Sequence, residues 1–145
     1  MLTEDLAYSQ EDIDYLKHGP DALTLRLFRP AGQGPFPLVV DLHGGAWTAG
    51  DLSGCQARDE VLVKAGFAVA ALDFRHAGDG YPTSLVDINY AVRWLKDRSG
   101  DLSLDPDRVG LSGQSSGGHL AMLAAMRPHD DRSGAVALPG GANAN

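Results

Sequence analysis

The sequence has little cysteine, no long apolar run and no excess of basic residues. Its single cysteine, Cys55, cannot form a disulfide within the chain, so no framework of disulfide bonds holds this fold. The most apolar stretch, Phe67–Leu72, is far too short to cross a bilayer, and we expect no membrane partner. Lysine and arginine number 12 against 19 for aspartate and glutamate. This balance argues against nucleic acid as a partner, because a surface that follows phosphates needs a basic excess.

Three other features of the sequence limit its location, cofactors and size. The first residues, Met1–Asp5, are acidic where a secretory signal would be basic and then apolar, so we expect a cytoplasmic protein. No Cys and His spacing is typical of a metal site, and no phosphate loop ends in Gly-Lys-Ser or Gly-Lys-Thr, so we expect neither a metal nor another cofactor. The 145 residues, 43% of them hydrophobic and 21% charged, have the length and composition of one globular domain.

Short runs typical of strands alternate with longer helical patterns. Leu23–Phe28 alternates apolar and polar residues before Pro30, as a half-buried strand does. The continuous apolar runs Leu38–Leu42, Phe67–Leu72 and Arg108–Leu111 predict strands that are buried on both faces. The alternation predicts an α/β fold, a mostly parallel sheet with helices on both faces.

The first predicted helix follows a possible capping box. Ser53 and Gln56 have the spacing at which the two side chains satisfy each other's backbone donors, which would open a helix through Lys64. Gly66 would then end that helix.

Two more helices and a turn are predicted further along the chain. One helix begins near Thr83 or Ser84, and its apolar face is formed by Leu85, Ile88, Val92 and Leu95. Asp105–Asp107 has the composition of a turn that leads into the last strand. Gly117–Met126, rich in alanine and leucine, predicts the third helix.

The last predicted strand runs directly into a G-x-S-x-G motif. Gly113–Gly117 (GQSSG) stands between a strand and a helix, the setting of a nucleophile elbow. The chain must reverse so sharply at Ser115 that side chains at Gly113 and Gly117 would collide with the turn or with a neighbouring strand. Ser115 would then project at the start of a helix, where the dipole and free N–H groups favour developing negative charge. The motif therefore predicts that Ser115 is a catalytic nucleophile.

A second motif, His43–Trp47 (HGGAW), follows the strand Leu38–Leu42. Paired glycines let backbone N–H groups approach a substrate, so an oxyanion hole would combine the Ser116 N–H with that of Gly44 or Gly45. His43 and Trp47 are candidates for the wall of the substrate pocket. The alternatives are that the two glycines only permit a tight turn, and that Trp47 only packs at the rim of the core.

These motifs, with the helical sequence after Ser115, Tyr81–Pro82 and Asp105–Val109, resemble those of α/β-hydrolase-fold serine esterases. The similarity is to carboxylesterases, hormone-sensitive-lipase-like esterases and acetylxylan or feruloyl esterases with the HGG-x-W pattern, and it runs from about Leu23 onward. The resemblance implies hydrolysis of short-chain carboxylic esters, small molecules, through an acyl-enzyme on Ser115. It also implies that the N–H groups of Gly44, Gly45 and Ser116 hold the oxyanion.

The resemblance leaves the general base without a residue in this chain. In that fold the triad acid and histidine follow the nucleophile, and the candidates after Ser115 are only His119, His129, Asp130 and Asp131. None of them stands where the fold places its base. We therefore expect residues 1–145 to be the N-terminal part of a single α/β-hydrolase domain, truncated after the nucleophile helix.

A truncated sheet would leave the strand Arg108–Ser112 as an open, apolar edge. The expected partner is a C-terminal companion polypeptide that supplies the acid and the histidine, or a second copy of the chain across that edge. Two alternatives stay open. One is an inactive fragment or a non-catalytic hydrolase-like module that binds a ligand or a partner; the other is an amidase or formamidase on the same scaffold.

Overall fold

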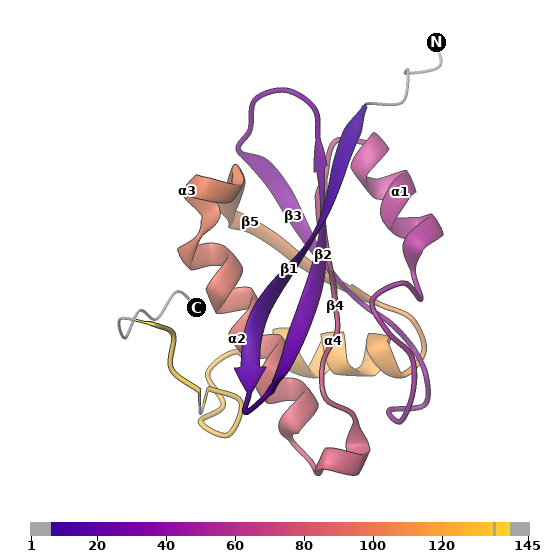
Figure 1. Cartoon of the computed structure of the whole chain (residues 1–145), viewed down its shortest axis with the longest axis vertical. Coiled ribbons are helices and arrows are strands. Elements are labelled where there is room, and N and C mark those ends of the chain that lie inside the picture. Colours follow the sequence, from indigo (N-terminus) through magenta and orange to yellow (C-terminus); the bar gives the residue numbers. More distant parts are fainter. Residues whose placement is uncertain (1–6, 135, 140–145) are drawn as a thin grey trace.

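A mixed sheet is the centre of the molecule, as described for residues 7–134 and 136–139 by a computed structural model (Figure 1). Within those residues the strands are β1 (Tyr8–His18), β2 (Asp21–Pro30), β3 (Phe36–Leu42), β4 (Ala68–Leu72) and β5 (Leu104–Gly113). Their order is β1-β2-β4-β3-β5. β3 pairs parallel with β4 and β5, whereas β2 pairs antiparallel with β1 and β4. The acidic opening segment, on which the prediction about a secretory signal depends, lies outside the described residues.

Helices cover both faces of the sheet, as the sequence predicted. The helical elements are α1 (Gln56–Lys64), η1 (Ala77–Asp79), α2 (Thr83–Asp97), α3 (Ser99–Leu102) and α4 (Ser116–Met126). α1 packs on one face, and α2 and α4 pack on the other (Figure 1). None of the helices among the described residues is long and apolar enough to cross a membrane.

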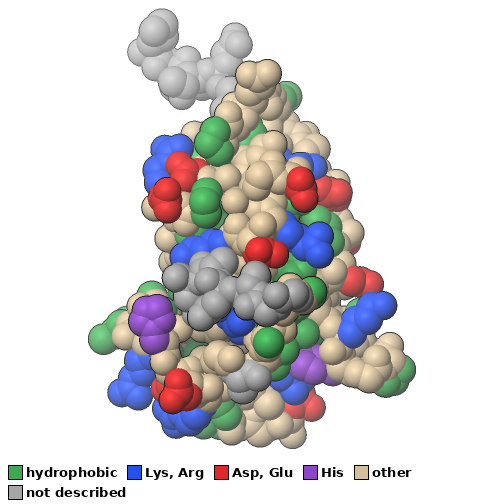
Figure 2. Space-filling model, turned by 90° about the vertical axis from the view of Figure 1, so that its left-hand side faces the viewer, with side chains coloured by type: hydrophobic (Ala, Val, Ile, Leu, Met, Phe, Trp, Pro, Cys, Tyr) green, Lys and Arg blue, Asp and Glu red, His purple; other side chains and the backbone are tan. Residues whose placement is uncertain are grey.

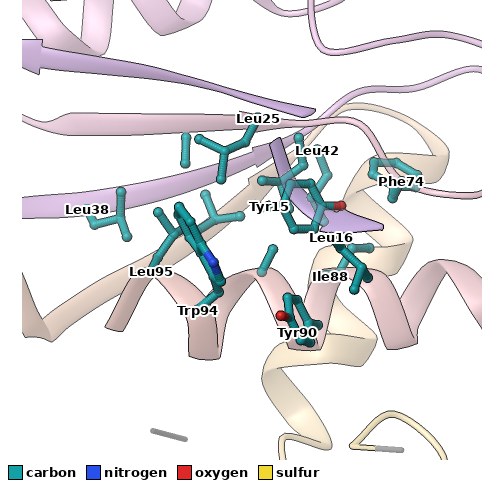
Figure 3. Packing of buried hydrophobic residues seen from close by; sticks show 14 of the residues in the cluster. Tyr15, Leu16, Leu25, Leu38, Leu42, Phe74, Ile88, Tyr90, Trp94 and Leu95 are labelled. Carbon is teal, nitrogen blue, oxygen red and sulfur yellow. The ribbon is translucent and has the colours of Figure 1, made fainter. Parts of the chain in front are cut away.

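The two faces of each strand divide the core between these helices. On β4, Ala68 and Ala70 face the α2 side, while Val69 and Ala71 face α1. The larger cluster lies between α2 and the strands, where Figure 3 shows Trp94 and the neighbouring side chains of α2 beneath the sheet. Because burial of one large apolar side chain contributes about 1.5–3 kcal/mol, this cluster is the main stabilising feature of the fold.

Three predictions about secondary structure need correction, and one strand was not predicted. The capping box is wrong: α1 begins after Cys55 without a side-chain cap, and the Ser53 hydroxyl donates instead to the Asp51 carboxylate. Asp105–Asp107 lies inside β5, where a register shift between the pairs Phe36↔Leu104 and Leu38↔Val109 lets the turn-forming residues bulge out.

The third correction and the strand that was not predicted concern the edges of the sheet. β5 is not buried on both faces, because it is the outermost strand and most of its residues are partly or fully exposed. Its edge position confirms the expected open edge. β1, for which nothing was predicted, forms the opposite edge.

The surface shows no concentration of charge on the side drawn in Figure 2. Basic and acidic side chains are interspersed there among apolar and neutral atoms. The net charge of −7 is therefore not gathered into one acidic field on that side.

Candidate active site

The turn between β5 and α4 holds Ser115 in a backbone conformation that only special surroundings maintain. Ser115 has φ 54° and ψ −122°, a positive φ that non-glycine residues rarely adopt and that costs about 1–3 kcal/mol. The Ser115 carbonyl accepts hydrogen bonds from the N–H groups of Gly118 and His119 at 3.0 and 3.3 Å. The side chain of Ser115 is exposed at this sharp turn, as in a strand–turn–helix elbow.

Two glycines permit this turn because the backbone passes too close for any side chain. A Cβ atom at Gly113 would lie 2.2 Å from the Gly117 carbonyl oxygen. A Cβ atom at Gly117 would lie 2.1 Å from the carbonyl oxygen of Leu42, the last residue of β3. These contacts agree with the predicted collisions, and they bring the start of α4 against the end of the neighbouring strand.

The glycine loop after β3 lies directly beside the elbow. A Cβ atom at Gly44 would be 2.9 Å from the Gln114 carbonyl oxygen and 3.3 Å from Cβ of Ser115. Gly45 has φ 137°, and its carbonyl accepts hydrogen bonds from Thr48 and Ala49, which closes the loop into a turn. The paired glycines therefore form a tight turn and also lie close to Ser115, so the two interpretations of this motif do not exclude each other.

Ser116 also lies at the elbow, at the start of α4. The two candidate pocket residues differ in their surroundings, because Trp47 is exposed and His43 is buried. Ser116 is the first residue of α4, so its N–H has no acceptor within the helix. Trp47 is 47% exposed, and its Nε1 donates to Nδ1 of His119 at 3.3 Å. His43 is buried, stacks on Phe74 with ring centroids 4.5 Å apart, and donates from Nδ1 to the Gly44 carbonyl at 2.7 Å. His43 is therefore buried behind the glycine loop and holds it through the Gly44 carbonyl.

An apolar cavity of about 200 Å³ opens beside Trp47. Its walls come from the glycine loop, the segment around η1, the start of α2, and α4: Trp47, Ala77, Gly80, Tyr81, Pro82, Ser84, Leu85, His119, Leu120 and Leu123. His43 is not among these lining residues. Sequence reasoning singled out Trp47 but missed that His119, four residues after Ser115, is its hydrogen-bond partner and shares the same wall.

None of the chain's five histidines hydrogen-bonds Ser115 within residues 7–134 and 136–139. His18, on β1, is paired instead with Asp87 of α2 at 3.1 Å. Asp87 is fully buried and also accepts a hydrogen bond from the Arg75 guanidinium at 2.8 Å. The Arg75–Asp87 ion pair therefore connects the loop after β4 to α2. Nor does the described part of the chain group three His, Cys, Asp or Glu side chains that could hold a metal ion.

A buried pair of carboxyl groups lies on the α1 side of the sheet. Asp41 of β3 is 1% exposed and Asp59 of α1 is 0% exposed. Burial and a hydrogen bond with Asp41 raise the pKa of Asp59 to about 8. Burial opposes ionisation of Asp41 as well, but hydrogen bonds from Asp59 and Arg58 outweigh it and hold the pKa of Asp41 below its ordinary value. This pair was not predicted, because an aspartate in a short helix usually faces water.

Comparison with known proteins shows similarity to esterases. The family model BD-FAE matches residues 25–137. The protein named Probable carboxylic ester hydrolase LipM, from Mycobacterium tuberculosis, is 35% identical over 102 residues, which are 68% of this chain and 23% of LipM. An arylesterase of Saccharolobus solfataricus is 28% identical over 132 residues, 90% of this chain and 40% of that protein.

Solved structures agree with the sequence comparison. A structure of a bacterial heroin esterase superimposes with a TM-score of 0.76 at 26% identity, and the match covers 89% of this chain and 41% of that one. The chain thus spans less than half the length of these relatives.

Proposed function

Since the chain belongs to the BD-FAE family, α/β-hydrolase carboxylesterases, we propose that it carries the nucleophile and the oxyanion hole of a serine esterase. The family and the fold class expected from the sequence are thereby confirmed. Ester hydrolysis is the activity of the family, whereas the roles of single residues and the substrate of this protein are the proposal.

The observation that carries the proposal is the close packing of the glycine loop against the elbow. The Gly44 backbone lies so near Ser115 that a Cβ atom would be 3.3 Å from the serine Cβ. An ester carbonyl attacked by Ser115 would place its developing oxyanion between this loop and the start of α4. There the N–H groups of Gly44, Gly45 and Ser116 would stabilise the negative charge, an effect worth about 3–4 kcal/mol per donor in serine hydrolases.

The reaction would proceed in two steps. The Ser115 oxygen forms a bond to the ester carbonyl carbon, and the alcohol leaves with a proton, which gives an acyl-enzyme. Water then attacks the acyl group, releases the acid and restores the serine hydroxyl. Both steps need a base that takes and returns the proton. We assign it to a histidine in a C-terminal part of the same domain, beyond residues 1–145. Loss of aryl-ester hydrolysis in the variant Ser115→Ala is the direct test.

The cavity beside Trp47 is our candidate for the substrate's acyl or alcohol group. Its lining is almost entirely apolar, so it would favour a hydrocarbon chain or ring. We expect Trp47→Ala to lower the ratio of kcat/KM for 4-nitrophenyl butyrate to that for the acetate by roughly tenfold, because the longer chain loses an apolar wall. Kinetics of the whole domain, C-terminal part included, with both esters measure the ratio.

The control for this prediction is Val61→Ala, an exposed position on α1 at 67% exposure. It should leave the ratio unchanged. An unchanged ratio in Trp47→Ala as well would mean that the acyl chain binds elsewhere.

The edge strand β5 is where we propose that the remainder of the domain, or a second copy of the chain, adds its strand. An apolar hollow of about 350 Å³ borders this edge between α2 and α4, with Val92, Val109, Leu111 and Ala124 among its lining residues. An unpaired strand beside an apolar hollow is a template for pairing with another strand. The cytoplasmic location stays a prediction of the sequence.

This placement of the partner predicts the association state of the chain alone. We expect residues 1–145 to sediment as a species larger than the monomer, because β5 offers unpaired backbone groups to a second copy. Leu111→Lys should shift the chain toward the monomer, since a charge on an edge strand opposes pairing. A chain that is monomeric without this substitution, and without a second polypeptide, would contradict the proposed edge.

A further inference from the structure

The buried carboxyl pair of Asp41 and Asp59 cannot be fully ionised at low cost. Arg58 donates from Nη2 and Nε to the two oxygens of Asp41 at 2.5 and 3.1 Å. Neither buried oxygen of Asp59 accepts a hydrogen bond from an N–H or O–H group of the described residues. A buried charge without a hydrogen-bonded counterion is expensive, and Arg58 forms its hydrogen bonds to carboxylate with Asp41, not Asp59. A proton on Asp59 neutralises one charge and supplies a donor to Asp41.

This pair is connected to the end of β5, which leads into the nucleophile elbow. Asp41 of β3 is the register partner of Ser112 on β5, and the Ser112 side chain hydrogen-bonds it. Arg58 Nη2 also donates to Sγ of Cys55 at 3.1 Å, and the Cys55 thiol donates to Oε1 of Gln114 at 3.8 Å. Ser112 and Gln114 flank the turn that holds Ser115. Two chains of contacts therefore lead from the carboxyl pair to the elbow.

We propose that Asp59 and Asp41 share one proton and that this acid pair positions the nucleophile elbow. Neither side chain is placed to touch substrate, so both are positioning residues rather than catalytic ones. The proposal rests on the proposed function only in naming Ser115 as the nucleophile. The contacts themselves are present whatever the reaction is.

The groups that face Asp59 decide the protonation state of the pair. Arg58 of its own helix and Arg26 of β2 favour the charged form, while Asp41 and burial oppose it and prevail. β4 contributes only apolar side chains to this face, and the pKa of the Cys55 thiol is itself raised by burial. Because the pKa of Asp59 rises from 3.8 to about 8 on folding, the folded chain holds this proton more tightly than the unfolded chain does. Its stabilising effect is complete below the unfolded pKa and is lost as pH rises through the folded pKa.

Nuclear magnetic resonance can follow the elbow directly, without any turnover. We would record backbone amide shifts of the chain from about pH 6 to pH 10, with Ser112, Gln114 and Ser115 assigned. We expect the three amides to titrate together with a midpoint near 8, the pKa of Asp59. In Asp59→Asn the new side-chain amide at position 59 donates to Asp41 at every pH. The three backbone signals should therefore stay near their low-pH positions, with no midpoint in that range.

Asp101→Asn is the matched control, because Asp101 is exposed on α3, and it should keep the midpoint. Elbow amides that do not share a midpoint in the unmodified chain, or a midpoint that survives Asp59→Asn, would overturn the proposal. Should Asp59→Asn fail to fold, the titration of the unmodified chain decides. Failure of ester hydrolysis would not change these shifts, so the two hypotheses fail separately.

Discussion

Ser115→Ala is expected to reduce hydrolysis of a short-chain aryl ester by at least about a thousandfold. The serine oxygen forms the acyl-enzyme, and alanine leaves the oxyanion hole without a nucleophile beside it. Release of 4-nitrophenol from the acetate measures the effect in the whole domain, with the C-terminal part that supplies the histidine, and in its variant; residues 1–145 alone are assayed beside them. The variant should fold normally, since the Ser115 side chain is exposed.

Ser9→Ala on β1 controls for the loss of a hydroxyl far from the elbow, at the opposite edge of the sheet. Turnover that vanishes only in Ser115→Ala would identify the nucleophile. Turnover by residues 1–145 alone would mean that a histidine reaches Ser115 from an unexpected place in this chain or from a companion. No turnover by residues 1–145 alone would agree with a base in the C-terminal part of the domain. Turnover that is undiminished in Ser115→Ala would refute the assignment.

The elbow could be predicted from the sequence because its geometry depends on residues that are adjacent in the chain. A glycine two residues on either side of Ser115, after an apolar run and before a helical one, leaves few other interpretations. That Gly44 and Ser115 lie near each other could be predicted, because both follow strands of a parallel sheet and the ends of neighbouring parallel strands meet. Its distance depends on the pairing of β3 with β5, which no local pattern shows.

β1 could not be predicted because its pattern changes phase. A register shift between Asp14 and Leu16 breaks the alternation, so that Tyr15 and Leu16 are both buried although they are neighbours. Such a bulge removes the period of two that reveals a half-buried strand. Asp59 was missed for a different reason: its burial comes from the packing of α1 on β2 and β4 and from the contact with Asp41 of β3, which no pattern within the helix shows.

Gly117→Ala is expected to destabilise the chain by about 3 kcal/mol or more. The new Cβ atom would lie 2.1 Å from the Leu42 carbonyl oxygen and 2.5 Å from that of His43, both backbone atoms at the end of β3. Backbone cannot rotate away as a flexible side chain can, so α4 must separate from the sheet. Urea denaturation followed by circular dichroism measures the loss.

Gly110→Ala separates this contact from a general effect of replacing glycine. A Cβ atom at Gly110 meets nothing within 4 Å, so we expect its stability to change by no more than about 0.5 kcal/mol. Large destabilisation at Gly117 beside a neutral Gly110 would show that close backbone approach, rather than flexibility, requires glycine in the elbow. Equal stability of the two variants would mean that α4 can move off β3 freely. The Gly44 loop and Ser115 would then not be held together by the fold, and the oxyanion hole would lose its structural basis.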